Sequence, residues 1–388
     1  MILDILLKSV HAVTPTEILE GVDILIQDGH IARIDTGIVI PHAYQINGVG
    51  LLAIPGIIDL HSDAVEKWIQ PRPGGRFNVE VALTELDKYL ASCGITTIYH
   101  CFCFGDTNRV DELRRGSVTR DLTHFIHGMH SRLGINNRIH ARYDMLEYEF
   151  SYILKSLIQE RRIQLFSIMN HAPGQGQFTS LDHFTAYYSQ AAHLSFEETA
   201  ALAERRIRLN NNFDDSHVLQ LTSLCREQGI PMASHDDDTK EKVQWVRSLG
   251  VDISEFPVRR DAAQKARTLG MDVLMGAPNV LRGESLTNNL SGREAIKEGF
   301  CNMMGSDYSP MSMIHAVFAL HRVMGIPLHE AVNMVTLNPA KAVGEENICG
   351  AIQEGLMADL VLVDASSEVP RIIKTFVHGR EVFSTCRL

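Results

Sequence analysis

The chain has 388 residues, of which 45% are hydrophobic and 21% charged, and its formal net charge is −11. This composition is typical of a globular protein and excludes a mainly disordered, collagen-like or coiled-coil chain, while the length suggests one large domain and a smaller one. The acidic balance disfavours a nonspecific nucleic-acid binder, but basic side chains that converge locally would still hold an anionic substrate.

Both ends of the chain predict short β-strands. Apolar and polar residues alternate near the N-terminus, Asp28-Gly29 is a hairpin signal, and residues 358–383 contain similar runs. The predicted strands are Ile2–Val13, Asp23–Gln27, His30–Asp35, Ala358–Val363, Ile372–Val377 and Glu381–Phe383. We therefore expect residues 1–53 and 345–388 to form one small β-sandwich domain built from both termini.

Residues 54–344 alternate predicted strands and helices. Strands are expected at Ile57–Leu60, Thr96–Cys101, Ile139–Tyr143, Gln164–Met169, Met232–Ser234, Ile253–Phe256, Val273–Met275 and Asn302–Gly305. The helices between them include Ala82–Ser92, Phe150–Glu160, Glu197–Asn210 and Asp261–Leu269. Eight β-then-α units favour an α/β fold of the (β/α)8 TIM-barrel type. The alternative, a doubly wound sheet, would need a glycine-rich phosphate loop after the first strand, and residues 59–63 are not one.

The cysteine pattern and the apolar runs predict the compartment. Seven cysteines are scattered without a CxxC pair, which favours a reducing, cytoplasmic location and no disulfide framework. The first residues lack a basic segment and a cleavage site, and no apolar run reaches the roughly 20 residues needed to cross a bilayer. We expect a cytoplasmic protein that binds neither membranes nor nucleic acid.

In a TIM barrel the chemistry lies at the carboxyl ends of the strands, and this rule selects among the 18 histidines. Strand ends hold imidazoles and carboxylates that could share one rim: His61, Asp63, Asp144, His171, His235 and Asp307. Mixed nitrogen and oxygen ligands suit Zn²⁺ first, with Mn²⁺, Fe²⁺ or Ni²⁺ as alternatives, and more than four ligands would favour two ions. A metal-bound water ionises near neutral pH, and Asp307 would take its proton.

Several nearby residues have a structural interpretation instead. Asp59 is expected to point away from the rim, and His100 to pack in its strand or support the ligands. Of the three residues Asp236–Asp238, we expect at least two to form a solvated turn or to cap the helix before Lys240.

Basic residues follow the same strand ends. Lys67, Arg72, Arg142 and Arg282 are candidates for binding phosphate, whereas Arg76 is better explained as ordinary surface charge. The loops 71–74 and 174–177 add glycines, whose backbone amides suit an anion. A small anionic substrate is therefore predicted.

The ordered motifs resemble those of the amidohydrolase superfamily. The resemblance rests on residues 55–61 (PGIIDLH), 336–340 (TLNPA), 350–352 (GAI) and 358–360 (ADL), and it covers nearly the whole chain. Residues 61–63 (HSD), 66–67 (EK), 71–74 (PRPG), 170–175 (NHAPGQ), 234–237 (SHDD), 255–257 (EFP), 275–279 (MGAPN) and 306–308 (SDY) are similar to its phosphonate-operon branch, the ribose triphosphate diphosphatases of the carbon–phosphorus lyase pathway.

That resemblance implies a metal-dependent barrel that hydrolyses a ribose 5-triphosphate and releases pyrophosphate. The six rim residues would hold one or two divalent metals, and the four basic residues would neutralise charge on the phosphoryl oxygens and the leaving group. The chain departs from the branch pattern at Ala64 (Asn), Trp68 (His) and Asp144 (Glu). The changes at Ala64 and Trp68 affect the expected substrate more than the expected metal site. Asp144 keeps the carboxylate of the glutamate in the branch pattern, but its side chain is shorter.

Two other functions remain open at this point. The same metal water would attack a carbonyl in a hydrolase of C–N bonds, such as a cyclic amide or N-acyl substrate. A third hypothesis is that the protein is an inactive subunit that binds metal within an operon-encoded complex. The sequence also leaves room for a homo-oligomer.

Overall fold

The computed structural model describes residues 4–72, 74–105, 113, 116–176, 178, 180–191, 194–285 and 289–386. Pro73 and Gln177, which belong to two of the predicted loops, lie outside these residues.

Eight parallel strands form the barrel, in the order in which they follow one another along the chain. They are β6 (Ile57–Ser62), β7 (Ile95–Phe104), β8 (Asn136–Asp144), β9 (Leu165–Met169), β10 (Met232–His235), β11 (Ile253–Glu255), β12 (Asp272–Gly276) and β13 (Met303–Gly305). A bridge between Ser62 and Asp307 joins the two edges of the sheet. Nearly all strand residues are buried, as expected of parallel strands covered on both faces. The predicted TIM barrel is confirmed, and each predicted strand overlaps an observed one.

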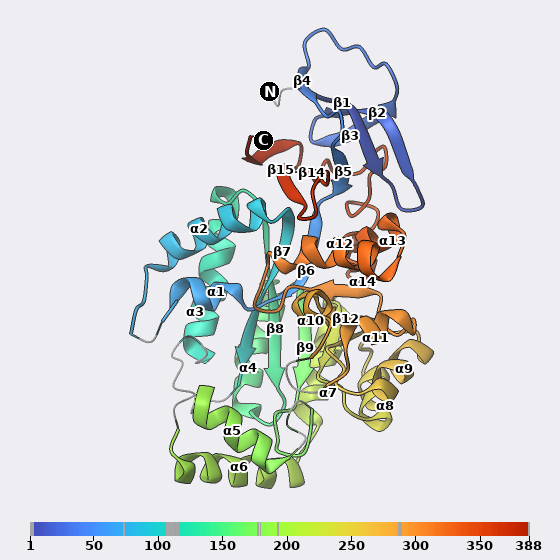
Figure 1. The fold of residues 1–388 in the computed structure, drawn as a ribbon. Coiled ribbons are helices and arrows are strands. Elements are labelled where there is room, and N and C mark those ends of the chain that lie inside the picture. Colours follow the sequence, from blue (N-terminus) through green and yellow to red (C-terminus); the bar gives the residue numbers. More distant parts are fainter. Residues whose placement is uncertain are drawn as a thin grey trace.

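Helices surround the barrel (Figure 1). They are α1 (Ala64–Ile69), α2 (Val79–Ser92), α3 (Gly116–Met129), α4 (Ser151–Gln159), α5 (Leu181–Ala191), α6 (Phe196–Asn211), α7 (Ser216–Gln228), α8 (Lys240–Ser248), α9 (Arg260–Thr268), α10 (Ala277–Arg282), α11 (Gly292–Lys297), α12 (Ser312–Met324), α13 (Leu328–Asn333) and α14 (Leu337–Ala342). No helix in the described part of the chain is both long and apolar enough to span a membrane.

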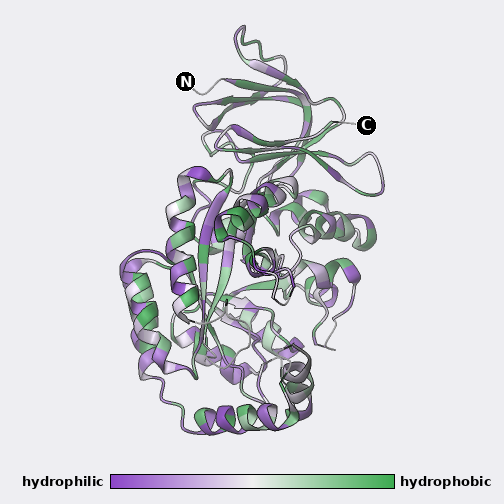
Figure 2. Ribbon diagram, turned by 90° about the vertical axis from the view of Figure 1, so that its left-hand side faces the viewer, coloured by the Kyte–Doolittle hydropathy of each residue, from purple (hydrophilic) through white to green (hydrophobic). Residues whose placement is uncertain are grey.

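Strands from both chain ends form a second, separate sheet (Figure 2). Its members are β1 (Ile5–Val13), β2 (Ile18–Gln27), β3 (His30–Asp35), β4 (Tyr44–Asn47), β5 (Leu52–Pro55), β14 (Leu360–Asp364), β15 (Arg371–Val377) and β16 (Arg380–Ser384). The antiparallel pairing of β5 with β14 joins the two ends of the chain. The sheet encloses its own apolar core, which includes Leu7, Ile24, Leu360 and Phe376, and it fits the predicted β-sandwich domain.

Gly56 stands where the chain passes from this sheet into the barrel. A Cβ atom at this position would lie 2.1 Å from Thr96 Oγ1, so only glycine lets β6 begin this close to β7. The close packing of β6 against β7 therefore explains why a glycine follows Pro55.

The barrel has a helical insertion on the side where the site lies. Helices α5 and α6 follow β9 before the ordinary barrel helix α7, and Figure 1 shows them beyond the carboxyl ends of β8 and β9, away from the terminal sheet. Helix α6 starts with a capping box, in which Ser195 and Glu198 satisfy each other's backbone amides.

Candidate metal centre

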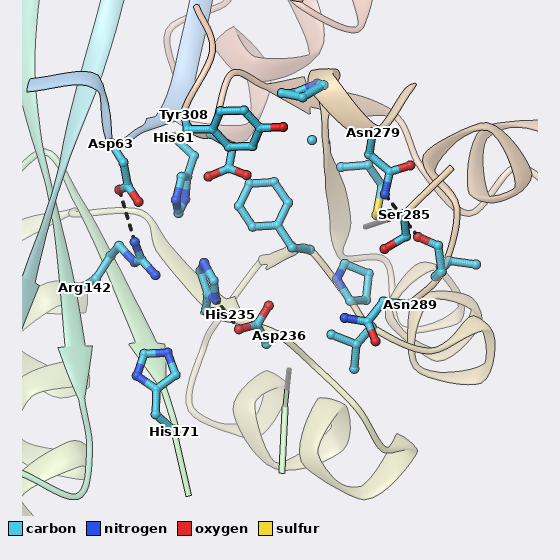
Figure 3. A pocket seen from close by; sticks show the side chains of 18 of the residues that line it. His61, Asp63, Arg142, His171, His235, Asp236, Asn279, Ser285, Asn289 and Tyr308 are labelled. Carbon is cyan, nitrogen blue, oxygen red and sulfur yellow. Dashed lines mark hydrogen bonds and ion pairs between the residues drawn. The ribbon is translucent and has the colours of Figure 1, made fainter. Parts of the chain in front are cut away.

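A cavity of about 310 Å³ opens at the carboxyl ends of the barrel strands. Figure 3 shows imidazole and carboxylate side chains from several strands facing the same space. Seven of the predicted site residues line it: His61, Asp63, Arg142, His171, His235, Arg282 and Asp307. The strand-end rule therefore brings together residues that are up to 246 positions apart in the chain (61 to 307).

His61 is the centre of the possible metal ligands. Its ligand atoms lie within 4.8 Å of those of Asp63 and Asp307, and equally within 4.8 Å of those of His235 and Glu255. The His61 and His235 rings are 5.2 Å apart. Nε2 of His235 is buried and has no hydrogen-bond partner among the described residues. Because an unpaired buried imidazole nitrogen is costly, this donor set fits a divalent metal.

Three strand ends reach the cavity through a strained backbone. Asp236, Phe256 and Asp307 have φ angles of 53°, 51° and 53°, and all three line the cavity. A left-handed conformation costs a non-glycine residue on the order of 1 kcal/mol and concentrates at functional sites. The three strained residues lie just after the carboxyl ends of β10, β11 and β13.

Asp144 lies beside the cavity without lining it. Its Oδ2 atom is 2.9 Å from Arg206 Nη1 and 3.3 Å from His171 Nδ1. Burial opposes the charge of Asp144, yet Arg206 and His171 outweigh burial and hold its pKa well below the usual range. The carboxylate of Asp144 thus orients His171 and forms an ion pair with Arg206 of α6. The role of Asp144 as a metal ligand stays a prediction.

Replacing Arg206 by methionine is expected to destabilise the protein by about 3–5 kcal/mol, because it takes the guanidinium away from the buried Asp144 carboxylate. Denaturant unfolding of the metal-free protein measures this. Adding Asp144→Asn should restore much of the loss, since the neutral amide no longer needs a cation.

The neighbouring Arg205 offers a matched control for that experiment. Arg205 pairs with Glu147 through two contacts of 2.9 Å, but its side chain is 32% exposed. Glu147 is itself buried, but it keeps a second cation in that variant, because Arg206 Nη2 lies 3.7 Å from its Oε1. Arg205→Met should therefore cost less than Arg206→Met. An equal loss in both variants would contradict the special role of the buried pair.

Asp307 is kept partly protonated by its surroundings. Burial raises the pKa of Asp307 to about 7, with the nearby Asp63 charge adding to the effect, while Arg142 and Lys67 oppose it. A carboxyl group with this pKa is suited to accept and release a proton near neutral pH.

In metal-free protein this shift predicts a pH-dependent stability difference between Asp307→Asn and the unaltered chain. The folded state holds the Asp307 proton more tightly than the unfolded chain, so the carboxyl group increasingly destabilises the fold as the pH rises from about 4 to about 7. Asp307→Asn removes this penalty, so its stability advantage should grow over that window to on the order of 4 kcal/mol. Unfolding curves in chelator at several pH values measure it; a constant difference would contradict the shift.

Cations gather around Tyr308 at the rim. Lys67 Nζ lies 4.9 Å from the centre of the Tyr308 ring, and Arg282 Nη1 lies 2.5 Å from its hydroxyl oxygen. Arg142 is buried deeper, with Nη1 3.2 Å from Asp63 Oδ1. Arg72 is exposed and does not line the cavity. The structure thus brings together three of the four predicted phosphate-binding residues.

The structure corrects the interpretation of residues 236–238. Asp236 is buried and lines the cavity, and Asp237 is fully buried. The helix that begins at Lys240 is capped by Thr239, whose hydroxyl accepts the Lys242 amide. The prediction of a solvated turn or an aspartate cap is wrong, because the bend at Asp236 folds these carboxylates inward.

Sequence reasoning missed Asp236, Glu255 and His140 as parts of this region. Glu255 and His140 are fully buried below the cavity, near His61. The sequence signals for Glu255 are its place near the end of a predicted strand and the motif at residues 255–257, to which no chemical role was given. His100 and Asp59 behave as expected: His100 Nε2 contacts Asn137 Oδ1 at 2.7 Å, and Asp59 accepts the amides of His61 and Ser306.

Comparisons with known proteins agree with this geometry. The profile of the amidohydrolase family matches residues 209–382. The α-D-ribose 1-methylphosphonate 5-triphosphate diphosphatase of Escherichia coli K12 is 31% identical over 97% of this chain and 100% of its own length. Dihydroorotase of Aquifex aeolicus is 21% identical over 94% of this chain and 90% of its own. A putative prolidase from Bifidobacterium longum has the same fold, with a TM-score of 0.65, 16% identity and coverage of 100% of this chain and 97% of its own.

Proposed function

Since the chain belongs to the amidohydrolase family, a family of hydrolases, we propose that it is a metal-dependent triphosphate diphosphatase that releases pyrophosphate from a ribose 5-triphosphate in phosphonate catabolism. The observation that carries the proposal is the cationic group at the rim. Lys67 and Arg282 meet at Tyr308, next to the proposed ligand Asp307. An acidic protein with clustered cations at one cavity suits a small polyanionic substrate.

The metal would be held by His61, Asp63, His171, His235 and Asp307, with Asp144 as a further candidate, and we propose Zn²⁺, as one or two ions. When bound, such a metal supplies Lewis acidity and lowers the pKa of water toward neutrality. Asp307, which lines the same cavity, is the proposed proton acceptor beside this metal.

The roles that we propose for the basic residues differ with the burial of their side chains. The buried Arg142 holds Asp63 and keeps positive charge beside the reacting phosphorus. The exposed Lys67 and Arg282 bind the outer phosphoryl oxygens, and Arg282 is fixed by Tyr308. Cations placed in advance stabilise charge that grows on the leaving pyrophosphate.

We also propose that the protein acts in the cytoplasm.

Product analysis tests this function. Metal-loaded protein is incubated with a ribose 5-triphosphate bearing an alkylphosphonate at C1, and in parallel with nucleoside triphosphates. One pyrophosphate per turnover and a 5-phosphate product are expected. Release of orthophosphate alone, or no turnover of any triphosphate by metal-loaded protein, would contradict the proposal.

Hydrolysis of a C–N bond is the second candidate, because another relative, 24% identical, is named as a 5-methylthioadenosine/S-adenosylhomocysteine deaminase, and deamination breaks a C–N bond. Assays of ring opening, amine release and ammonia release on cyclic amides and N-acyl substrates distinguish it. Turnover there, without pyrophosphate release, would favour this candidate.

Arg282→Gln is expected to raise the KM for the triphosphate about tenfold or more, because one charged hydrogen bond contributes about 1.5–3 kcal/mol. The matched control is Arg72→Gln, which removes the same charge from an exposed loop position outside the cavity lining. Steady-state kinetics of pyrophosphate release compares them. A larger effect at Arg72 would overturn the assignment of the phosphate contacts.

A further inference from the structure

A fully buried carboxylate, Glu255, lies directly below the cavity and has not been given a role above. It ends β11, and its Oε1 atom is 3.3 Å from Nδ1 of His61. The other oxygen, Oε2, has no hydrogen-bond partner among the described residues. A buried carboxylate with a single partner is costly to the fold, which raises the question of what it does.

The other close group, His140, does not satisfy Glu255. Nδ1 of His140 lies 2.9 Å from the carbonyl oxygen of Leu60, which only accepts, so this nitrogen carries the proton of the neutral ring. Nε2 of His140 is then an acceptor, and it takes the Ser167 hydroxyl at 2.8 Å. It lies 3.6 Å from Glu255 Oε2 and has no proton to offer. His61 is therefore the donor to Glu255.

Asp237 shows what a structural carboxylate looks like in the same barrel. It is as deeply buried as Glu255, but its Oδ2 accepts the hydroxyls of Ser234 and Ser254, both at 2.6 Å. Its Oδ1 lies 3.4 Å from Lys242 Nζ. Asp237 therefore has two hydroxyl donors and a nearby cation, although its Oδ1 has no hydrogen bond among the described residues. Glu255 has a single hydrogen bond among the same residues, and that bond is to a proposed metal ligand.

We propose that Glu255 is the positioning residue of the metal centre, which accepts the Nδ1 proton of His61 and so directs Nε2 of that ring into the cavity. This inference rests on the metal centre proposed above. A carboxylate behind a ligating imidazole fixes its tautomer and orientation and makes it a better ligand. Since β6 and β11 are not neighbours in the sheet, the contact also ties the ligand His61 to a strand across the barrel interior.

The test separates metal binding from folding. Zn²⁺ affinity is measured by chelator competition on metal-depleted protein, and the melting temperature is measured without metal. Glu255→Gln is expected to weaken Zn²⁺ binding 10- to 100-fold, while the metal-free melting temperature stays the same or rises, because glutamine keeps the shape of a buried side chain whose only hydrogen bond in the described part of the chain is the one to His61. Glu255→Met, which also keeps the length of the side chain, should show the same pattern.

The matched control is Asp87→Asn on α2, whose partners lie around the start of β8, the end of that strand away from the ligands. Asp87 is buried and accepts the amides of Gly134 and Ile135 and the Asn137 side chain. This variant should lower the metal-free melting temperature and leave Zn²⁺ affinity unchanged. A purely structural Glu255 would behave like Asp87, and that result overturns the inference.

Two further outcomes separate this inference from the proposed function. Unchanged Zn²⁺ affinity in both Glu255 variants overturns the positioning role and leaves the metal centre standing. Failure of the unaltered protein to bind Zn²⁺ overturns the metal centre, and the role of Glu255 with it.

Discussion

His61→Ala is expected to lose bound metal and pyrophosphate release together. Among the described residues His61 belongs to all three groups of side chains close enough to share a metal: with Asp63 and Asp307, with His235 and Glu255, and with Cys101 and His140. No other residue belongs to more than one of these groups, so the loss of His61 weakens every arrangement of ligands they allow. Metal analysis of the purified variant and the pyrophosphate assay measure the two effects.

The control for that variant is His124→Ala, which removes a partly exposed imidazole on α3. It should keep both metal and activity. Because His61→Ala also leaves Glu255 without its donor, a melting curve must show that the variant folds, and His61→Asn serves as a second substitution. Full metal content and activity in a folded His61 variant would overturn the site.

Asp307→Asn is expected to lower kcat about 10²- to 10⁴-fold, the usual contribution of a positioned proton acceptor. The amide keeps the size and the left-handed backbone of Asp307, which asparagine tolerates, but it cannot take a proton. KM should change less than kcat, since the phosphate contacts lie at Lys67 and Arg282.

Metal content distinguishes the two roles proposed for Asp307. If the variant retains metal through the histidines and Asp63 but loses turnover, the proton acceptor is confirmed. The control Asp121→Asn changes an exposed aspartate on α3 and should leave kcat unaltered. A kcat in Asp307→Asn within a few-fold of the unaltered protein would exclude the role.

The sequence was most informative where local pattern and site geometry coincide. Strand periodicity identified the eight barrel strands, and the strand-end rule then selected His61, His171 and His235 from 18 histidines. This succeeded because parallel strands in a barrel all present their carboxyl ends at one face. His61 on β6 and Asp63, the residue directly after that strand, both line the cavity, as the two-residue spacing predicts.

Local pattern was insufficient where a side chain's partner comes from elsewhere in the chain. Asp144 was predicted as a rim ligand, but Arg206, 62 positions later on the inserted α6, takes one of its oxygens. Residues 236–238 looked like a polar turn, yet two serines on different strands bury Asp237 between them. Sequence gives residue types and spacing; burial and pairing depend on which surfaces pack together.

By itself, then, the sequence determined the barrel, its joined ends and the chemical character of the rim, because these follow from periodicity and from the order of strands. Only the tertiary structure decided which atoms face one another. It placed Glu255 behind His61 across 194 positions and gathered Lys67, Arg282 and Tyr308 into one cationic group. Such contacts are set by strand register and side-chain direction in the closed barrel, which no local stretch of sequence encodes.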